Sequence, residues 1–467
     1  MFKKLLNNIV FKNFSYLTIG TVIAQVISLI TILKITDFLS PDDYGLFTFL
    51  IAQGMLLLKI GDLGNMNIVI RTIARRPERT NDLVVNVAII RTLAVISLFL
   101  LYIVYNYYLG SLSVENLGLL FIFSLISCFS SLFELVFMGH QKMLPTSIIN
   151  LAYSIIWFLI VFLVLDRNSD VSYIFLFYIL ASLTKAALFY TFLRRYHLLQ
   201  GKVQNFFVSS KQLIAESWPY FAIILIMLPL TSLSNNFLDI NSSNEEIGYF
   251  NLSQKLIGPI SLVITMLLTA VFPNLSSLWG KDEEKFKKYL SAGFGAYMLT
   301  GMIICFLFAL FSKEVVALLF PKGYQAAIQV CQIQVWYLFL TSVDSLIGVV
   351  LGAANREKMI LRYSLVYFLI CTPTLFFGSY YGAIGLSYAY VFSFGISMLY
   401  VWVSFKKTLQ LKIQNDGLIW VLALALFIIS YFVSLQTLLI YKIAIALAVV
   451  GLLSVYLLKK FKPLLVR

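Results

Sequence analysis

Charged residues are scarce in this sequence, and their scarcity excludes an ordinary soluble domain. Only 12% of the 467 residues are Asp, Glu, Lys or Arg, and 60% are hydrophobic, whereas a soluble domain carries roughly a quarter charged residues. Cysteine and histidine are also rare. The 4 cysteines form no Cys-x-x-Cys pair, and the 2 histidines have no carboxylate or serine arrangement around them. We therefore expect no metal site, no cofactor and no nucleophilic centre.

Motifs for nucleotide chemistry and large polar domains are also missing. No Gly-x-x-x-x-Gly-Lys-Ser/Thr segment is present to cradle a phosphate, so we expect no ATP hydrolysis within this chain. The longest loops between apolar runs cover only residues 194–216 and 274–289. A membrane-embedded glycosyltransferase or ligase, which normally carries a larger polar region for sugar handling, is therefore a less favoured alternative.

Long apolar runs fill the chain from end to end. Crossing ~30 Å of hydrocarbon takes about 20 helical residues, and continuous runs favour helices over the alternating strands of a barrel. We predict an all-α polytopic membrane protein with about fourteen transmembrane helices. The expected spans are residues 14–39, 46–70, 83–105, 116–138, 147–165, 171–193, 217–239, 249–273, 290–311, 326–352, 359–378, 382–404, 418–434 and 438–457.

Lysine and arginine are concentrated in alternate loops. The chain start, the loops near residues 71–79, 142, 194–211, 281–288, 356–362 and 406–412, and the chain end are basic, whereas the loops on the opposite side hold only Arg167, Lys313 and Lys322. By the positive-inside rule both termini are cytoplasmic and the number of spans is even. Basic loops next to anionic membrane lipid also explain the net charge of +14 without a nucleic-acid partner.

Two similar motifs indicate an internal duplication. Asp42-Asp43-Tyr44-Gly45-Leu46-Phe47 and Glu245-Glu246-Ile247-Gly248-Tyr249-Phe250 each follow an apolar segment, and we expect Gly45 and Gly248 to permit tight turns at matching hinges. The predicted organisation is two pseudo-symmetric six-helix lobes, residues 1–200 and 201–412, followed by two further helices and a tail in residues 413–467.

Ionisable residues inside predicted spans are the main candidates for function, because a charge there costs at least ~2.5 kcal/mol. Lys34, Lys185 and Lys255 lie deepest on this map and have no obvious local partner. Lys59 and Asp62 share a helix face, so a mutual ion pair is an alternative for them. Arg91 and Asp239 fall near predicted span ends, where reaching the interface is an alternative. The predicted cationic cavity consists of Lys34, Lys59, Arg91, Lys185 and Lys255, and the predicted proton- or ion-coupling residues are Asp62, Glu134 and Asp344.

Four of the 10 prolines, Pro219, Pro229, Pro259 and Pro273, fall in the two neighbouring spans 217–239 and 249–273. Proline removes a backbone donor and clashes with the preceding turn, so these helices are expected to be kinked or broken. A moving gate and a static kink are both consistent with this pattern.

Five stretches stand out at the starts and ends of predicted spans: Asn13-Phe14-Ser15-Tyr16, Leu39 to Phe47, Ser217-Trp218-Pro219-Tyr220, Glu246 to Phe250 and Val271-Phe272-Pro273. They resemble stretches of bacterial polysaccharide biosynthesis flippases, the O-antigen and capsule transporters of the multidrug/oligosaccharidyl-lipid/polysaccharide exporter superfamily. The resemblance covers the whole chain and implies two six-helix bundles around a cavity that opens alternately to either side. It implies a bacterial cytoplasmic membrane location and a polyprenyl-pyrophosphate-linked glycan as cargo. A polysaccharide polymerase is a further expected partner.

The resemblance leaves two relatives as alternatives. A multidrug or cation antiporter of the same superfamily would favour a cavity dominated by carboxylates, and a peptidoglycan-precursor flippase also has fourteen spans.

Overall fold

The computed structural model describes residues 9–110, 112–166, 169–201, 206–278, 283–354, 356–411, 416–436 and 438–465. Within these ranges all regular elements are helices, which confirms the all-α prediction. Among the described residues, 12 segments are long and apolar enough to cross a membrane. One of them, Lys358–Leu409, contains two helices, and the helix Asn244–Leu278 is not among the 12. The chain divides into two compact units, Met1–Gly248 and Tyr249–Arg467.

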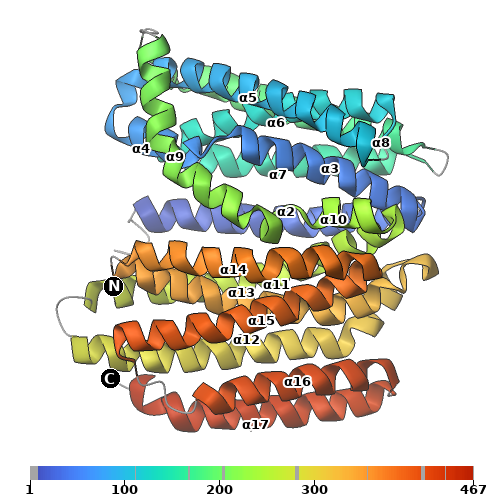
Figure 1. Cartoon of the computed structure of the whole chain (residues 1–467), viewed down its shortest axis with the longest axis vertical. Coiled ribbons are helices and arrows are strands. Elements are labelled where there is room, and N and C mark those ends of the chain that lie inside the picture. Colours follow the sequence, from blue (N-terminus) through green and yellow to red (C-terminus); the bar gives the residue numbers. More distant parts are fainter. Residues whose placement is uncertain are drawn as a thin grey trace. The chain divides into compact units, whose positions relative to one another are not determined.

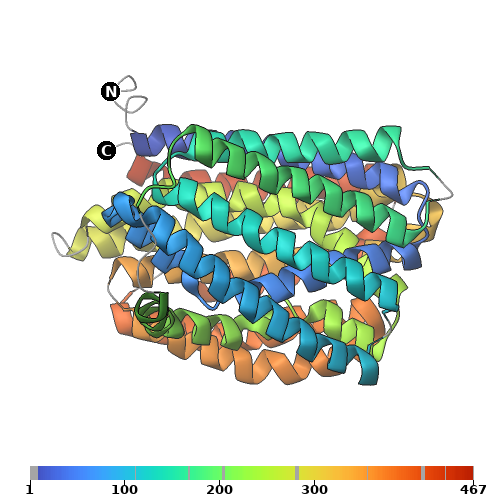
Figure 2. The ribbon, with the colours of Figure 1, turned by 90° about the horizontal axis from the view of Figure 1, so that it is seen from above.

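The first unit is a bundle of helices that run mostly side by side (Figures 1 and 2). Helix α2 packs on α7, α6 packs on α3, α5 and α8, and α9 packs on α4 and α5. The bounds are α2 Ile9–Thr36, α3 Pro41–Gly61, α4 Asn65–Arg75, η1 Pro77–Arg79, α5 Thr80–Tyr108, α6 Val114–Gly139, α7 Met143–Leu163, α8 Val171–Arg195, α9 Phe206–Thr231 and α10 Ser234–Asn241, with the start of α11 Asn244–Leu278.

The connections α4–α5, α6–α7 and α8–α9 meet at one end of this unit, which we call the basic end. Thr80 Oγ1 lies 3.1 Å from His140 Nε2, and the Asn81 amide donates to the Gln200 carbonyl at 2.8 Å. The Lys142 ammonium lies 4.6 Å from the centre of the Tyr196 ring. Basic loops far apart in sequence therefore lie together, as the charge pattern predicts for one side of a membrane.

The second unit contains most of α11 and the remaining helices. Helix α13 contacts α12, α14, α15 and α16, and α12 also packs on α16 and α17. The bounds are α12 Glu283–Leu319, η2 Lys322–Tyr324, α13 Ala327–Ala353, α14 Glu357–Gly378, η3 Ser379–Tyr381, α15 Gly382–Leu409, α16 Asp416–Gln436 and α17 Leu439–Leu465. The boundary at Gly248 differs from the lobes expected at 1–200, 201–412 and 413–467, because α9 and α10 belong to the first unit. The division into repeats stays a prediction.

The predicted continuous span 46–70 is wrong. Helix α3 ends at Gly61, Leu63 and Gly64 take φ values of 50° and 75°, and α4 begins at Asn65. The reason is the close approach of α9, since a Cβ on Gly64 would lie 2.6 Å from the Phe221 backbone nitrogen. Only glycine fits both the left-handed conformation and the available space.

The expected turns at Gly45 and Gly248 are also wrong, because both glycines lie inside helices, close to the starts of α3 and α11. Ser40 caps α3 by accepting a hydrogen bond from the Asp43 amide at 3.1 Å. A Cβ on Gly45 would lie 1.7 Å from the Asn244 carbonyl oxygen, and one on Gly248 would lie 2.4 Å from the Pro41 carbonyl oxygen. The two motifs therefore serve a contact between helix starts within the first unit. Whether this contact is a hinge stays a prediction.

The prolines affect the two predicted spans differently. Helix α9 contains Pro219 and Pro229 and bends, since its start crosses the neighbouring helices and is seen end-on in Figure 2, while its later part runs along them in Figure 1. It ends at Thr231 before α10 begins, so this span is broken. Helix α11 continues without interruption past Pro259, so it is kinked at most. The side chain of Pro273 is not among those that the structure describes.

Candidate functional site

The first unit contains a cavity of about 520 Å³, which we call the Arg91 cavity. It is lined by four of the ionisable residues that the sequence suggests as candidates: Lys59, Asp62, Arg91 and Glu134. Its other lining residues are Leu58, Gly64, Met66, Asn67, Ser131, Leu135, Met138, Tyr220, Ile223 and Ile224. The break between α3 and α4 therefore opens beside this space, with α5, α6 and α9 forming the other walls.

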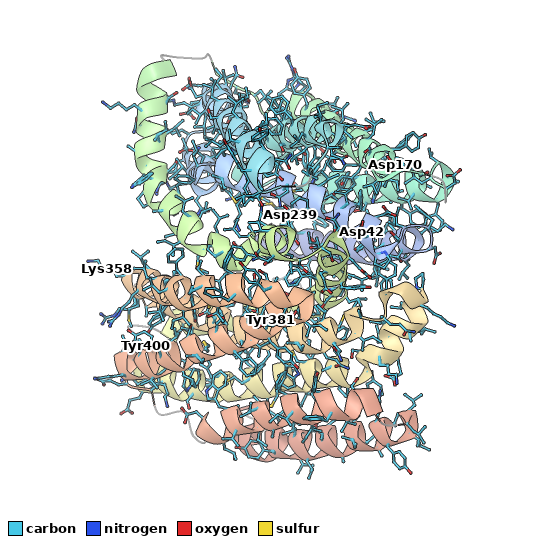
Figure 3. The ribbon with its side chains drawn as sticks, turned by 45° about the vertical axis from the view of Figure 1, so that its right-hand side comes forward. Asp42, Asp170, Asp239, Lys358, Tyr381 and Tyr400 are labelled. Atoms are coloured by element: carbon cyan, nitrogen blue, oxygen red, sulfur yellow. The ribbon has the colours of Figure 1, made fainter. Side chains whose placement is uncertain are left out.

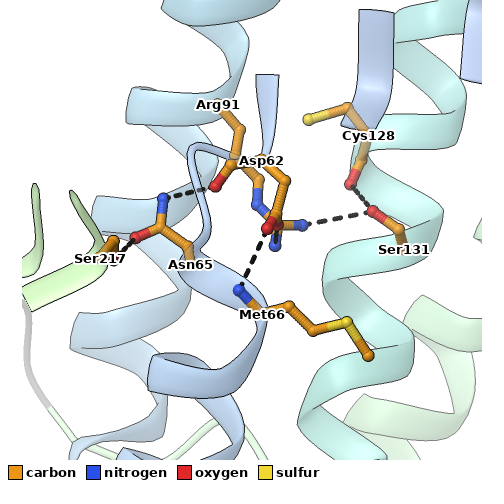
Figure 4. Close-up of polar contacts among 7 residues, drawn as sticks. All are labelled: Asp62, Asn65, Met66, Arg91, Cys128, Ser131 and Ser217. Carbon is orange, nitrogen blue, oxygen red and sulfur yellow. Dashed lines mark hydrogen bonds and ion pairs between the residues drawn. The ribbon is translucent and has the colours of Figure 1, made fainter. Parts of the chain in front are cut away.

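Arg91 is the most buried charged group of this cavity, with a side chain that is only 1% exposed. It forms an ion pair with the Asp62 carboxylate and donates to Ser131 Oγ at 3.2 Å (Figure 4). Among the described residues, the buried Nε–H of Arg91 has no hydrogen-bond acceptor. The guanidinium therefore has an unused donor.

These contacts correct two interpretations of the sequence. Arg91 does not lie at the end of its helix, because α5 extends from Thr80 to Tyr108, and its side chain is 1% exposed. The ion pair of Asp62 is formed with Arg91, whereas the Lys59 ammonium donates to Thr231 Oγ1 at 2.7 Å and Ser232 Oγ at 3.0 Å. Lys59 thus contacts the end of α9.

The helix break positions Asp62. The Met66 amide in the first turn of α4 donates to Asp62 Oδ2 at 3.2 Å, and the Asn65 side-chain amide donates to the Asp62 carbonyl at 2.8 Å. Ser217 of α9 in turn donates to Asn65 Oδ1 at 2.7 Å. A carboxylate at a helix start is stabilised by the free amides there, so Asp62 has support besides Arg91 (Figure 4).

Glu134 and Lys185 form the far edge of this group. The Asn150 amide donates to Glu134 Oε1 at 2.9 Å, and Glu134 acts electrostatically on Lys185. The Lys185 ammonium lies 5.3 Å from the centre of the Tyr153 ring and 5.8 Å from that of Phe189. Aromatic faces stabilise a cation at these distances, so Lys185 has a defined environment on α8.

The remaining candidates lie elsewhere. Lys34 is in the last turn of α2, 5.9 Å from the centre of the Phe162 ring, so the prediction that it lies deep in its span is wrong. Asp239 lies on α10 (Figure 3). It receives a 3.4 Å hydrogen bond from the Tyr105 hydroxyl. Lys255 and Asp344 belong to the second unit, where Lys255 is exposed on α11 and Asp344 accepts a 2.6 Å hydrogen bond from the Tyr367 hydroxyl.

Sequence reasoning missed the polar residues that support the Arg91 cavity. Asn65, Ser131 and Ser217 are neutral and common, so no sequence signal distinguishes them. It also missed Lys442, which is fully buried in the second unit and bonds Glu314 at 2.6 Å. That residue had a signal, because a lysine stands inside the predicted span 438–457.

The fold is similar to solved transporter structures. The lipid II flippase MurJ in an inward closed conformation matches with a TM-score of 0.73 and 15% identity, over 96% of this chain and 99% of that one. An inward-facing multidrug resistance MATE transporter of the MOP superfamily matches with a TM-score of 0.62 and 13% identity, over 83% of this chain and 95% of that one. A MATE transporter of Vibrio cholerae matches with a TM-score of 0.57 and 13% identity, over 87% of this chain and 98% of that one. At these identities the matches show a shared fold.

Sequence comparison identifies the family. No curated protein matches the chain. A family model described as "Polysaccharide biosynthesis protein" matches residues 10–279. Because this match covers more than half of the 467 residues, the chain belongs to the polysaccharide biosynthesis protein family.

Proposed function

We propose that this protein is a flippase that moves a polyprenyl-pyrophosphate-linked oligosaccharide from the cytoplasmic to the outer leaflet by alternating access. The cargo would serve cell-surface polysaccharide biosynthesis, such as O-antigen or capsule. Membership of the polysaccharide biosynthesis family and the likeness to a protein named as a lipid II flippase support this proposal. The observation that carries it is Arg91, a buried guanidinium that lines a cavity and retains a free donor among the described residues.

The chemistry of Arg91 suits a pyrophosphate. A guanidinium presents a planar fork that binds phosphate oxygens in pairs, and each such charge-assisted hydrogen bond is stronger than a neutral one. Asp62 occupies part of this fork, and it has the Met66 amide as a second partner. An arriving anion can therefore displace the carboxylate from Arg91 without leaving Asp62 unsupported.

The size of the cavity limits what part of the cargo it holds. A volume of about 520 Å³ is within the ~300–1,000 Å³ range of small-molecule sites and too small for a long glycan. We propose that it holds the pyrophosphate and adjacent groups while the polyprenyl tail stays in lipid. Lys59 lines the same cavity and adds positive charge to it. A role of Lys34, Lys185 and Lys255 in binding the cargo stays a prediction.

Replacing Arg91 tests this role. We expect Arg91→Gln to lower surface polysaccharide by about tenfold or more at equal protein level, since it removes charge-assisted contacts to the anion. Arg91→Lys keeps the charge but loses the fork and should restore only part of the transport. Because Arg91→Gln leaves Asp62 without its cation, the neutral pair Arg91→Gln/Asp62→Asn provides a variant with no uncompensated charge. Normal polysaccharide in this double variant would overturn the proposal.

A multidrug or cation antiporter is the second candidate, favoured by the two carboxylates Asp62 and Glu134 that line the same cavity. In that case Glu134→Gln would abolish proton-coupled uptake of a cationic dye by vesicles, and Arg91→Gln would not. If the protein is a flippase, Arg91→Gln should reduce transport of lipid-linked cargo more than Glu134→Gln does.

A further inference from the structure

A second cavity of about 230 Å³ lies in the first unit between α4, η1, α5 and α9. Arg71, Arg75, Arg76 and Arg79 line it, and we call it the arginine pocket. Its other lining residues are Ile68, Thr72, Asp82, Leu83, Asn86, Gln212, Leu213 and Glu216. The proposed function does not use any of these residues.

The arginine pocket has more positive charge than its own carboxylates neutralise. Arg71 pairs with Glu216 at 2.8 Å, and Arg79 pairs with Asp82 at 2.8 Å. In the part of the chain that the structure describes, Arg75 and Arg76 have no ion pair. Two guanidinium groups at this pocket are therefore available to an anion.

The turn that carries these arginines is fixed to the α8–α9 connection. The Asn81 backbone amide donates to the Gln200 carbonyl at 2.8 Å, and its side-chain amide donates to the Gly201 carbonyl at 3.1 Å. Gly201 has a φ of 93°, and a Cβ there would lie 2.2 Å from the Glu78 carbonyl oxygen. The backbone of the turn is thus held in place before any ligand binds, which lowers the ordering cost of binding.

The arginine pocket and the Arg91 cavity follow one another along the same helices. On α5 the pocket residue Asn86 precedes Arg91 by five positions, which is roughly 7.5 Å at 1.5 Å per residue. On α9 the pocket residue Glu216 precedes the cavity residue Tyr220 by four positions, which is roughly 6 Å. The arginine pocket is the one nearer the basic end, since Arg76 and Arg79 lie in the α4–α5 connection.

We propose that the arginine pocket binds the phosphate or pyrophosphate group of a membrane lipid at the basic end, one step before the Arg91 cavity. This role rests on the proposed function: the pocket docks the pyrophosphate of the cargo before that group reaches Arg91. Phospholipid head groups share this phosphate chemistry and are the other source of ligand.

Binding of farnesyl pyrophosphate, a short pyrophosphate lipid, to the full-length protein in non-ionic detergent tests the site. We use Arg91→Gln as the background, because it weakens the inner cavity. In this background we expect Arg75→Gln/Arg76→Gln to raise the dissociation constant by about tenfold or more, since two charge-assisted contacts are lost. The matched control is Arg194→Gln/Arg195→Gln, an exposed arginine pair at the end of α8 that does not line the pocket. The control should bind farnesyl pyrophosphate with the same dissociation constant as the Arg91→Gln background.

Competition identifies the source of the ligand. Displacement of farnesyl pyrophosphate by inorganic pyrophosphate and not by phosphatidylglycerol in mixed micelles supports cargo docking. Displacement by phosphatidylglycerol supports a lipid head-group site. Equal affinity of the Arg75→Gln/Arg76→Gln variant and its background overturns the proposal, since both residues are exposed and we expect their replacement to leave the fold intact. Normal transport by Arg91→Gln would instead overturn the proposed function and leave this result unaffected.

Discussion

Each unit contains an ion pair with a buried cation, and the two pairs differ in their surroundings; the carboxylate is 15% exposed in the first pair and 34% exposed in the second. In the first unit Arg91 is 1% exposed and Asp62 is 15% exposed, and both line the Arg91 cavity beside a broken helix. In the second unit Lys442 is fully buried, bonds Glu314 at 2.6 Å and donates to the Ser434 carbonyl at 2.6 Å. It thereby connects α17 to α12 and α16.

The comparison teaches how to distinguish a binding charge from a structural one. A buried cation needs partners in both cases, because an isolated charge in a low-dielectric interior is strongly disfavoured. Arg91 lies next to free volume, whereas Lys442 does not line either described cavity. Among the described residues each pair keeps one buried polar atom without a partner, Arg91 Nε and Glu314 Oε2, so the neighbouring cavity is what separates the two pairs. Ligand exchange should therefore be a property of the first pair, and mechanical support a property of the second.

The largest effect on stability is expected at the second pair. Glu314→Leu leaves the Lys442 ammonium buried with only a carbonyl partner, which should cost about 3–5 kcal/mol. Thermal unfolding in detergent, together with protease cleavage near α16 and α17, measures the loss. Transport per folded molecule should not change.

The double variant Glu314→Leu/Lys442→Met is the control, because replacing both charges by apolar groups removes the uncompensated ammonium and should restore most of the stability. Full stability of Glu314→Leu alone would show that the ion pair does not hold these helices. Asp416→Asn gives a second comparison, since its partner Lys406 is 28% exposed and the loss should be only about 1 kcal/mol or less.

A packing site in the first unit should behave like the structural pair and unlike Arg91. Gly45→Ala introduces a Cβ that would lie 1.7 Å from the Asn244 carbonyl oxygen, so α3 must separate from the start of α11 at a cost of about 1–3 kcal/mol. Gly118→Ala in α6 is the matched control, because nothing lies within 4 Å of its Cβ and alanine favours a helix. Unfolding curves of the two variants measure the difference. A Gly45→Ala protein as stable as Gly118→Ala would contradict the close contact.

A smaller effect on stability, with a change in affinity, is expected when the first pair loses its carboxylate. Asp62→Asn keeps the hydrogen bond from Met66 and leaves Arg91 beside a cavity that admits water, so we expect a loss of about 1–2 kcal/mol. The same variant removes the competitor for Arg91 and should tighten binding of farnesyl pyrophosphate. A loss of stability as large as that of Glu314→Leu, without tighter binding, would erase the distinction between the two pairs.

The sequence predicts the membrane class and part of the site for physical reasons. Long apolar runs and alternating basic loops are dictated by the bilayer itself, so they are visible without tertiary structure. Lys59, Asp62, Arg91 and Glu134 stand out because charges are costly in apolar spans. Which of them pair does not follow from the sequence, since the pairing of Asp62 with Arg91 depends on the packing of α3 against α5.

The errors come from tertiary contacts that local patterns do not encode. A hydropathy window cannot detect the break at Gly64. The backbone of α9, more than 150 residues later in the chain, packs against this glycine, and a local window does not contain that contact. Gly45 and Gly248 were expected in turns, yet each is required by the closeness of the other's helix. Glycine in a membrane helix therefore indicates close approach as readily as a turn.

The smallest effect concerns pH and again distinguishes the units, because both histidines of the chain belong to the first one. Burial, reinforced by the nearby Lys142, lowers the pKa of His140 below its ordinary value of 6.5. The native state then binds fewer protons than the unfolded state as the pH falls below about 6.5. The contribution of neutral His140 to stability is therefore complete above that pH, and it is lost as the pH falls through the lowered pKa. Thermal unfolding between pH 5 and 8 should therefore show a gentle acid-side decline that is weaker in His140→Gln, and an identical decline in both proteins would contradict the assignment.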